Sequence, residues 1–263
     1  MNNKEFEWDA VEYQKHSLVQ FEIGMTAIKK IDPRENENIL DIGCGDGKLT
    51  IEIAKRVPRG TVKAIDKSRE MVELANHNIQ EAKIDNIKLC KMDAINIKSK
   101  NFFDIVFSNS VFHWISNAEL MYKLVYKSLK KNGRIMITAV RKKIQPHMAG
   151  WMKLLRCKDF RKYFKDFTLP VHNLTVEETY QILKSANFSK IVVEPYNYML
   201  NFSNLDDLIN YHKTSILLPF LNCLPDDKLK KKYLKSFENV WINAYKNNPL
   251  LIKIPNVFIS AIK

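Results

Sequence analysis

Three glycines at alternate positions mark the stretch where this sequence concentrates residues capable of chemistry. Gly43, Gly45 and Gly47 follow the apolar run at 38–42, in N-I-L-D-I-G-C-G-D-G. Glycine is needed where the backbone takes a positive φ angle or approaches a ligand closely. A strand that ends in a glycine loop and leads into a helix places a nucleotide-type site at the carboxyl end of that strand.

Spacing separates the motifs that such a loop could represent. A phosphate-binding P-loop requires G-x-x-x-x-G-K-[ST], but Ile42 occupies its first glycine position and Leu49 follows Lys48. The dinucleotide motif G-x-G-x-x-G requires its third glycine where Lys48 stands. The pattern that fits is D-x-G-x-G-x-G, with Asp41 as its first residue. A glycine-rich turn without a ligand is the alternative that the loop alone leaves open.

Two further carboxylates stand at the ends of predicted strands. Asp66 ends the second apolar run, where a carboxylate can accept both ribose hydroxyls of a nucleoside. Asp93 ends the third, where its side chain can accept from an adenine amino group and the N–H of Ala94 can donate to a ring nitrogen. The alternatives are a charge ahead of a helix N-terminus for Asp66 and a solvated loop residue for Asp93.

The elements that would position these residues alternate between strand and helix. Expected strands are 38–42, 61–65, 87–92, 102–107 and 134–140, with helices at 48–56, 68–79 and 117–129 and a turn at 131–133. The strand at 102–107 is apolar enough to be buried on both faces, as in a parallel sheet. This alternation predicts an α/β fold with a doubly wound sheet.

The regions before and after these elements do not continue the alternation of strand and helix. We expect a single domain, with a helical lead at 1–31, a cofactor-binding core at 32–140, helical cap insertions at 141–174 and 203–247, and a final strand at 248–263. Within them we predict helices at 147–167, 175–187, 205–213 and 226–245, and strand pieces at 188–194 and 198–202. The inserted helices are expected to lie over the carboxyl ends of the strands, where open α/β sheets bind ligands.

Composition narrows the class of protein. The formal charge is +13, but lysines are spread along the chain and interleaved with acids, so a solvated surface is the main interpretation and an acidic partner the alternative. No run of about eighteen apolar residues predicts a membrane span, and the polar N-terminus does not resemble a signal peptide. Four separated cysteines without a C-x-x-C pair favour a reducing cytoplasm and give no metal signature.

Four features in this order resemble the core of the class I S-adenosylmethionine (SAM) methyltransferases. They are the glycine loop, Asp66, Asp93 and the segment F-D-I-V-F-S-N-S-V-F-H-W at 103–114. The resemblance covers about residues 37–140. It implies a mostly parallel seven-stranded, Rossmann-like sheet with SAM as cofactor. Y-Q-K-H-S-L-V-Q at 13–20 and F-H-W-I at 112–115 resemble a subgroup comprising the trans-aconitate, malonyl-acyl-carrier-protein and juvenile-hormone-acid methyltransferases, which esterify carboxylates.

The resemblance implies a cofactor site at the ends of the first four strands. Backbone N–H groups from Gly43 to Gly47 would take the carboxylate of SAM, and carbonyl oxygens of Gly43 and of Asn109 or Ser110 its ammonium. Met71 would pack on the adenine, with plain core packing as the alternative. The implied cofactor-binding residues are Asp41, Gly43, Cys44, Gly45, Gly47, Asp66, Lys67, Met71, Asp93, Ala94 and Asn109.

The acceptor side is assigned by the subgroup resemblance. Gln20 and Trp114 match its donors to the substrate carboxylate, and His113 would add a third donor or, for a hydroxyl acceptor, a base. Packing at a strand end is the alternative for His113. Trp8, Tyr13 and the helix after residue 147 would form a lid, or else pack in the core or on the surface.

Absent motifs disfavour nucleic acid as the substrate. Residues 109–112 read N-S-V-F, without the prolines of the base-methylating [ND]-P-P-[YF] motif, and no cysteine follows a proline. The leading hypothesis is O-methylation of a small-molecule or carrier-bound carboxylate. A second hypothesis keeps SAM but places the methyl group on a hydroxyl, amine or carbon. A third is a non-catalytic SAM-binding partner subunit.

Overall fold

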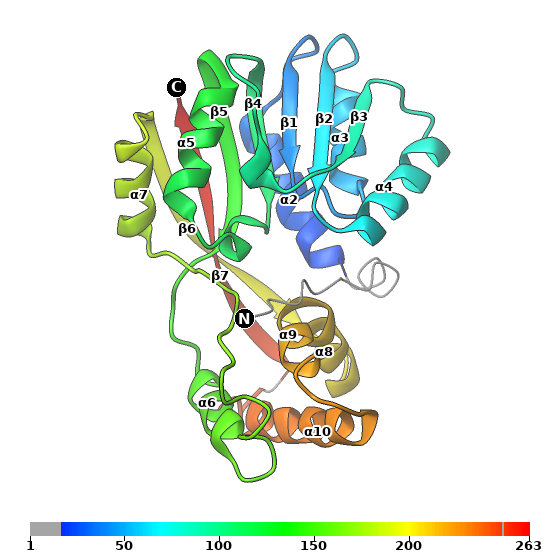
Figure 1. Cartoon of the computed structure of the whole chain (residues 1–263), viewed down its shortest axis with the longest axis vertical. Coiled ribbons are helices and arrows are strands. Elements are labelled where there is room, and N and C mark those ends of the chain that lie inside the picture. The colour runs from blue at the N-terminus through cyan, green and yellow to red at the C-terminus, as the bar shows by residue number, and fades with distance from the viewer. Residues whose placement is uncertain (1–16, 249) are drawn as a thin grey trace. The chain divides into compact units, whose positions relative to one another are not determined.

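The computed structural model describes residues 17–248 and 250–263, which divide between two compact units (Figure 1). We call the first the sheet unit; its described residues are 17–142, 171–196 and 255–263. The second, the helical unit, comprises 143–170 and 197–254 apart from residue 249. Strands β6 (Ser189–Asn201) and β7 (Leu251–Ile262) each contribute residues to both units.

The seven-stranded sheet has the order β3-β2-β1-β4-β5-β7-β6. Its other strands are β1 (Asn38–Ile42), β2 (Thr61–Asp66), β3 (Ile87–Lys91), β4 (Phe103–Asn109) and β5 (Leu129–Val140). The pairs β1–β2, β2–β3, β1–β4 and β4–β5 are parallel, whereas β7 runs antiparallel to β5. The strand order reverses between β1 and β4, which is the switch point where open α/β sheets bind ligands. The predicted mostly parallel, doubly wound sheet is confirmed.

Helices of the sheet unit form two groups. α2 (Leu18–Ile31), α3 (Lys48–Arg56) and α4 (Arg69–Glu81) contact one another in sequence, and α5 (Ala118–Ser128) contacts α7 (Val176–Ser185). Leu40 and Ile42 of β1 belong to the hydrophobic cluster formed with α5 and α7. Because side chains alternate along a strand, Asp41 points to the other face of the sheet, toward α3. Asp41 therefore lies beneath the glycine loop and not in the α5–α7 core.

The helical unit is organised around aromatic side chains. It contains α6 (Met148–Arg156), α8 (Leu205–His212), a π-helical turn (Lys213–Leu217), α9 (Leu218–Leu221) and α10 (Asp227–Ala244). Tyr233, Phe237 and Trp241 form the buried face of α10. No helix in the described ranges is both long and apolar enough to cross a membrane. The position of the insertions over the strand ends remains a prediction.

Two predictions about strand boundaries need correction. Residues 131–133, predicted as a turn before a strand, lie inside β5, where Asn132 has a φ of 62°. Phe103 of β4 pairs with Leu129 of β5, and Ile105 pairs with Arg134. An advance of two residues along β4 therefore corresponds to an advance of five residues along β5. The turn residues thus form a bulge. The two predicted strand pieces around Pro195 are one strand, β6, which tolerates proline because it lies at the edge of the sheet.

The predicted helix at 147–167 is also wrong in its second half. α6 ends at Arg156, and Cys157 already has extended backbone angles. Beyond it the chain makes turns that bury Phe160 and Phe164 against Tyr233, with ring centroids 5.1 and 5.6 Å apart. Tertiary packing of these rings overrides the helical preference of the local sequence.

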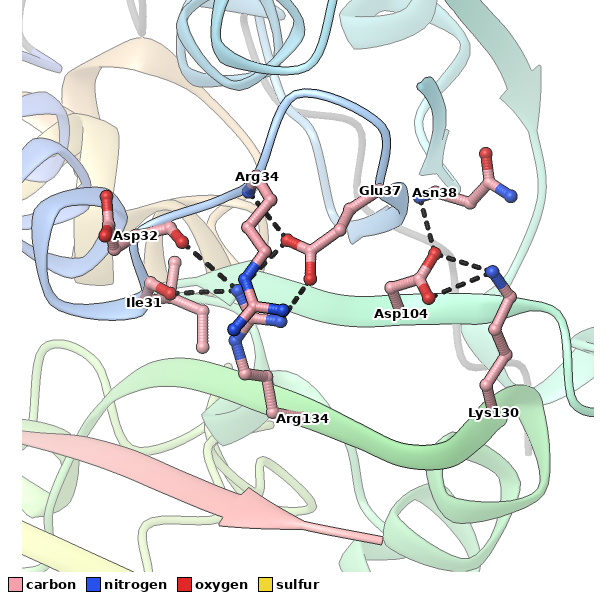
Figure 2. Close-up of polar contacts among 8 residues, drawn as sticks. All are labelled: Ile31, Asp32, Arg34, Glu37, Asn38, Asp104, Lys130 and Arg134. Atoms are coloured by element: carbon pink, nitrogen blue, oxygen red, sulfur yellow. Dashed lines mark hydrogen bonds and ion pairs between the residues drawn. The ribbon is translucent and has the colours of Figure 1, made fainter. Parts of the chain in front are cut away.

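A partly buried ion pair ties the end of α2 to the sheet (Figure 2). The guanidinium of Arg134 on β5 binds Glu37 through both of its terminal nitrogens, the Nη2–Oε2 distance being 3.0 Å. Nη2 also donates to the carbonyl oxygens of Ile31 and Asp32, both at 3.2 Å. A cation at the last carbonyls of a helix is favourable, so Arg134 fixes where α2 ends.

A second ion pair lies beside the first in Figure 2. Asp104 of β4 accepts from the ammonium of Lys130 at 2.7 Å and from the backbone N–H of Asn38 at 2.8 Å. Asn38 begins β1, so both ion pairs lie at the end of the strands opposite to the glycine loop. They hold α2, β1, β4 and β5 together without occupying the carboxyl ends.

Candidate active site

The glycine loop adopts the backbone that its sequence predicts. Gly43, Gly45 and Gly47 have φ angles of 72°, 54° and 78°, a region that disfavours other residues. A Cβ atom on Gly43 would lie 2.2 Å from Cγ2 of Val111, so the loop also packs too closely for a side chain there. Conformation and close approach therefore both require glycine at this position.

The end of β2 holds this loop through its backbone. The carbonyl oxygen of Ile65 accepts from the N–H groups of Gly43 and Cys44 at 2.8 and 3.0 Å. Gly47 donates to the carbonyl oxygen of Cys44 at 3.0 Å. Several N–H groups that the sequence assigned to the cofactor carboxylate are thus used within the protein. Their assignment to the cofactor stays a prediction.

Asp66 joins the loop to the next helix. Its Oδ2 accepts from the N–H of Gly45 at 3.0 Å, and its Oδ1 accepts from that of Ser68 at 2.9 Å. Ser68 in turn caps α4 by accepting from the N–H of Met71. Burial raises the pKa of Asp66, and hydrogen bonds from the backbone N–H groups of Ser68, Gly45 and Lys67 oppose that rise. A carboxylate has about four acceptor sites, so hydroxyl groups of a ligand would share the oxygens of Asp66 with these N–H groups.

The adenine side of the predicted site forms around the neighbouring strand end. The N–H of Met92 donates to the carbonyl oxygen of Asp66 at 2.8 Å, which places the ends of β2 and β3 side by side. Asp93 accepts from the N–H of Ile95 and caps a short 3-10 turn that starts at Ala94. Met71 is buried in α4, whereas Lys67 is exposed. The roles assigned to these four predicted residues remain predictions.

Asp41 is the most deeply buried carboxylate of the site. It is 2% exposed, and its Oδ2 accepts from the hydroxyl of Thr50 at 2.6 Å. Burial raises the pKa of Asp41 to about 7; the Thr50 hydrogen bond lowers it, and the charge of Asp66 raises it further. Burial beside Asp41 and Asp66 likewise raises the pKa of the Cys44 thiol, which therefore stays protonated.

A cleft of about 410 Å³, part of it open to solvent, adjoins the loop. Its walls are the first turn of α2, the glycine loop, the start of α3 and the ends of β1 and β4. The predicted site residues that line it are Gln20, Asp41, Gly43, Cys44, Gly45 and Asn109. The predicted residues outside its lining are Gly47, Asp66, Lys67, Met71, Asp93, Ala94, His113 and Trp114.

Asn109 and Gln20 meet at this cleft through a contact that the sequence did not reveal. The side-chain N–H of Asn109 donates to the backbone carbonyl of Gln20 at 3.0 Å. The hydroxyl of Thr138 donates to Oδ1 of Asn109 at 2.7 Å. Oδ1 and Nδ2 of Asn109 are thus both engaged, while Oε1 of Gln20 is buried without a hydrogen-bond partner among the described residues. A bound N–H or ammonium group would satisfy that oxygen.

His113 and Trp114 lie in a 3-10 turn after β4. His113 is buried, and its Nδ1 accepts from the N–H of Val140 at 3.4 Å. Burial lowers the pKa of His113 to about 4, so its imidazole is neutral at physiological pH. The ring of Trp114 lies 5.5 Å from that of His113. Trp8 and Tyr13, predicted as lid residues, fall outside the described residues.

Comparison with known proteins identifies the relatives of this site. A family model described as a methyltransferase domain matches residues 33–187, more than half of the chain. An uncharacterised methyltransferase of Schizosaccharomyces pombe is 34% identical over 134 residues, which are 49% of this chain and 50% of that protein. A malonyl-[acyl-carrier protein] O-methyltransferase of Priestia megaterium is 29% identical over 51% of this chain and 49% of that protein. The chain thus spans about half the length of these curated relatives.

A solved structure shares the fold over most of the chain. Phosphoethanolamine N-methyltransferase 2 of Haemonchus contortus, solved in complex with SAM, superposes with a TM-score of 0.62 at 16% identity. The match covers 97% of this chain and 57% of that protein. At this identity the likeness supports the Rossmann-like methyltransferase fold and not a shared acceptor.

Proposed function

The chain belongs to the family of SAM-dependent methyltransferase domains, and we propose that it methylates a carboxylate oxygen of a small-molecule or carrier-bound acid. The observation that carries the cofactor assignment is the glycine loop at the sheet's switch point, with positive φ angles at all three glycines. The carboxylate acceptor is supported by the motifs at 13–20 and 112–115 and by the Priestia relative.

The chemistry of the cleft fits the methionine portion of SAM. That portion carries an ammonium, a carboxylate and a positive sulfonium. Asp46 lines the cleft and adds a negative charge that suits the ammonium, and Asp41, whose pKa is raised to about 7, is partly ionised beside it at neutral pH. Lys48, paired with Asp46 at 3.2 Å, is the cation of the lining and suits the carboxylate. These residues would hold the cofactor's charged end, while Asp66 and Asp93 would hold its nucleoside.

In the proposed mechanism, the protein orients the acceptor and excludes water from the reacting atoms. When bound, SAM supplies a methyl group that is already activated toward nucleophiles. A carboxylate acceptor is ionised near neutral pH, so the protein need not remove a proton from it. We assign the amide N–H of Gln20 and the indole N–H of Trp114 to hold that carboxylate. Phe21, Leu49 and Phe107 give the cleft apolar walls that exclude water.

A hydroxyl acceptor is the second candidate, and His113 is the residue that would serve it as a base. Burial lowers the pKa of His113 to about 4, so the imidazole is neutral, but its Nδ1 accepts from the N–H of Val140 and would have to leave that hydrogen bond to take a proton. A carboxylate acceptor would make no use of that capacity. The two candidates therefore differ in the need for His113: His113→Phe would abolish hydroxyl methylation but leave most carboxylate methylation. A non-catalytic partner subunit is the third candidate, and it predicts SAM binding with no methyl transfer.

The test is a screen for methyl acceptance from SAM labelled in its methyl group. Dicarboxylic acids, fatty acids and acyl carrier proteins are offered in turn, and alkali is then used to release methanol from any ester. We expect alkali-labile label on an acid. Label stable to alkali, or SAM binding without transfer to any acid, would exclude the carboxylate proposal, and failure of the wild-type chain to bind SAM would exclude all three.

Acceptor-side variants sharpen this screen. We expect Gln20→Ala and Trp114→Phe to lower turnover of the accepted acid at least about tenfold, the loss from removing a charge-assisted hydrogen bond, while SAM affinity changes less. Gln181→Ala, on the exposed face of α7, is the matched control and should leave both unchanged. Equal losses of turnover and SAM affinity in Gln20→Ala would instead assign Gln20 to the cofactor.

The proposal extends to a partner surface and a compartment. If the acid is carried on a protein, D-D-K-L-K-K-K-Y at 226–233 is the cationic segment that would dock an acidic carrier. Activity on the carrier-bound acid would then fall steeply with salt, while activity on the free acid would not. All four cysteines are free thiols, which supports a reducing compartment such as the cytoplasm.

A further inference from the structure

The first turn of α2 forms one wall of the cleft, and the side chain of Asn109 fastens it to the end of β4. Ser17, Gln20 and Phe21 all line the cleft, and the N–H of Phe21 makes a helical hydrogen bond to Ser17 at 2.9 Å. The tether is the bond from Nδ2 of Asn109, at the end of β4, to the carbonyl oxygen of Gln20. This bond joins residues 89 positions apart in the sequence.

The tether depends on which way the Asn109 amide is turned. An amide has a donor and an acceptor side, and rotation by half a turn exchanges them. In the rotated orientation Oδ1 of Asn109 would face the carbonyl oxygen of Gln20, and two acceptors would repel each other. The hydroxyl of Thr138 selects the productive orientation by donating to Oδ1 at 2.7 Å.

Thr138 can make this selection because its own hydroxyl is fixed. Its oxygen accepts from the N–H of Ser110 at 3.1 Å, so its proton is directed to Asn109. The same N–H of Ser110 also donates to the carbonyl oxygen of Thr138 at 3.0 Å, so it is shared between the two oxygens of Thr138. Ser110 has a φ of 61°, which is uncommon for serine. Thr138 is fully buried in β5 and does not line the cleft.

We propose that Thr138 is a positioning residue for the cofactor cleft, because its hydroxyl orients the Asn109 amide, which in turn holds the first turn of α2 against the glycine loop. Thr138 touches neither cofactor nor acceptor and acts only through Asn109. The proposal rests on the assignment of SAM to this cleft, but its structural part concerns the protein without any ligand.

The first experiment measures SAM binding by titration calorimetry. Thr138→Val keeps the shape of the side chain but removes the hydroxyl, which leaves Asn109 free to rotate. We expect the Kd for SAM to rise about tenfold, the loss typical of one hydrogen bond whose partners stay buried and unpaired. Thr138→Ser restores the hydroxyl and should bring the Kd within about twofold of wild type. This rescue separates the hydroxyl's effect from that of packing.

A matched control removes an equally buried hydroxyl elsewhere in the sheet unit. Thr179 on α7 is 3% exposed, and its hydroxyl donates to the carbonyl oxygen of Thr175 at 2.8 Å. Thr179→Val should lower thermal stability as Thr138→Val does, yet leave the Kd for SAM unchanged. If Thr138→Val lowers stability but binds SAM as wild type does, the proposal is wrong.

The second experiment follows hydrogen exchange in the protein without ligand. We expect the peptide covering α2's first turn, residues 18–24, to exchange about five- to tenfold faster in Thr138→Val, with no change in Thr179→Val. Asn109→Asp provides a second variant, because it removes the donor to Gln20 while keeping the acceptor for Thr138. It should accelerate the same peptide.

The two experiments separate this proposal from the proposed function. Unchanged exchange of residues 18–24 in both Thr138→Val and Asn109→Asp would overturn the positioning role, whatever the acceptor is. A wild-type chain that binds SAM but methylates no acid would refute the carboxylate function and leave the positioning role intact. If the wild-type chain does not bind SAM, the cofactor assignment and the positioning role toward SAM both fail.

Discussion

Replacing Asp41 by asparagine is predicted to remove a pH dependence of stability that this one carboxyl creates. Asp41 is almost completely buried, and its hydrogen-bond partner is the neutral hydroxyl of Thr50. These contacts include no cation that would balance a negative charge on Asp41, and the negative charge of the neighbouring Asp66 makes ionisation of Asp41 less favourable. Asparagine has nearly the same shape, keeps an acceptor for Thr50 and carries no charge at any pH. The variant therefore mimics the protonated form.

The magnitude follows from the pKa of Asp41. Burial raises that pKa from 3.8 to about 7, so between these pH values the folded protein holds a proton that the unfolded chain has released. Stability is therefore greatest in acid and falls as the pH rises through about 7. At about 1.4 kcal/mol per pKa unit, the free energy of unfolding decreases by about 4 kcal/mol across this range.

The assay is scanning calorimetry of the wild-type chain and Asp41→Asn between pH 5 and 8. Because the chain has two compact units, the transition that SAM displaces identifies the sheet unit. We expect the Tm of this transition to fall in the wild type relative to Asp41→Asn by on the order of 10 °C across the range. Parallel Tm profiles for the two proteins would show that Asp41 titrates as an exposed aspartate does, and would refute the argument.

Three further predictions concern other parts of the chain. Gly43→Ala should abolish SAM binding and lower the Tm, since the new methyl group would collide with Val111 in a backbone conformation that disfavours alanine. Arg134→Met should cost about 1.5–3 kcal/mol in urea unfolding because the buried Glu37 loses both bonds to the guanidinium and keeps the backbone N–H of Arg34, and adding Glu37→Gln should recover part of the loss. His212→Phe should raise the Tm of the helical unit, because both ring nitrogens of the buried His212 lack partners among the described residues. The gain should be largest at acid pH. Burial lowers the pKa of His212 to about 3, so the stability of the wild type falls as the pH drops below about 6.5, where the unfolded chain takes up a proton. An unchanged calorimetric transition would contradict the predictions for Gly43→Ala and His212→Phe, and an unchanged urea transition would contradict the prediction for Arg134→Met.

The sequence predicts this fold well wherever the deciding physics is local. The five parallel strands and the three helices between them were expected from apolar runs, and the structure places each within a few residues except for the start of β5. The glycine loop was predicted for the same reason, because positive φ angles leave a direct trace in residue type. The errors arise where distant packing decides, as at Phe160 and Phe164, whose burial against Tyr233 ends a helix that the local sequence favours.

Side-chain contacts across the sheet escaped prediction for a related reason. The sequence placed Asn109 at the cofactor through its carbonyl oxygen, whereas the structure shows its side chain tethering Gln20, and no local pattern links residues 89 positions apart. Yet one signal was present. Thr138 is the single polar residue in I-M-I-T-A-V, an apolar run of the kind that a parallel sheet buries on both faces. A hydroxyl in such a place must find partners, so an isolated polar residue near the carboxyl end of a buried strand marks a position where site geometry is set from within the core.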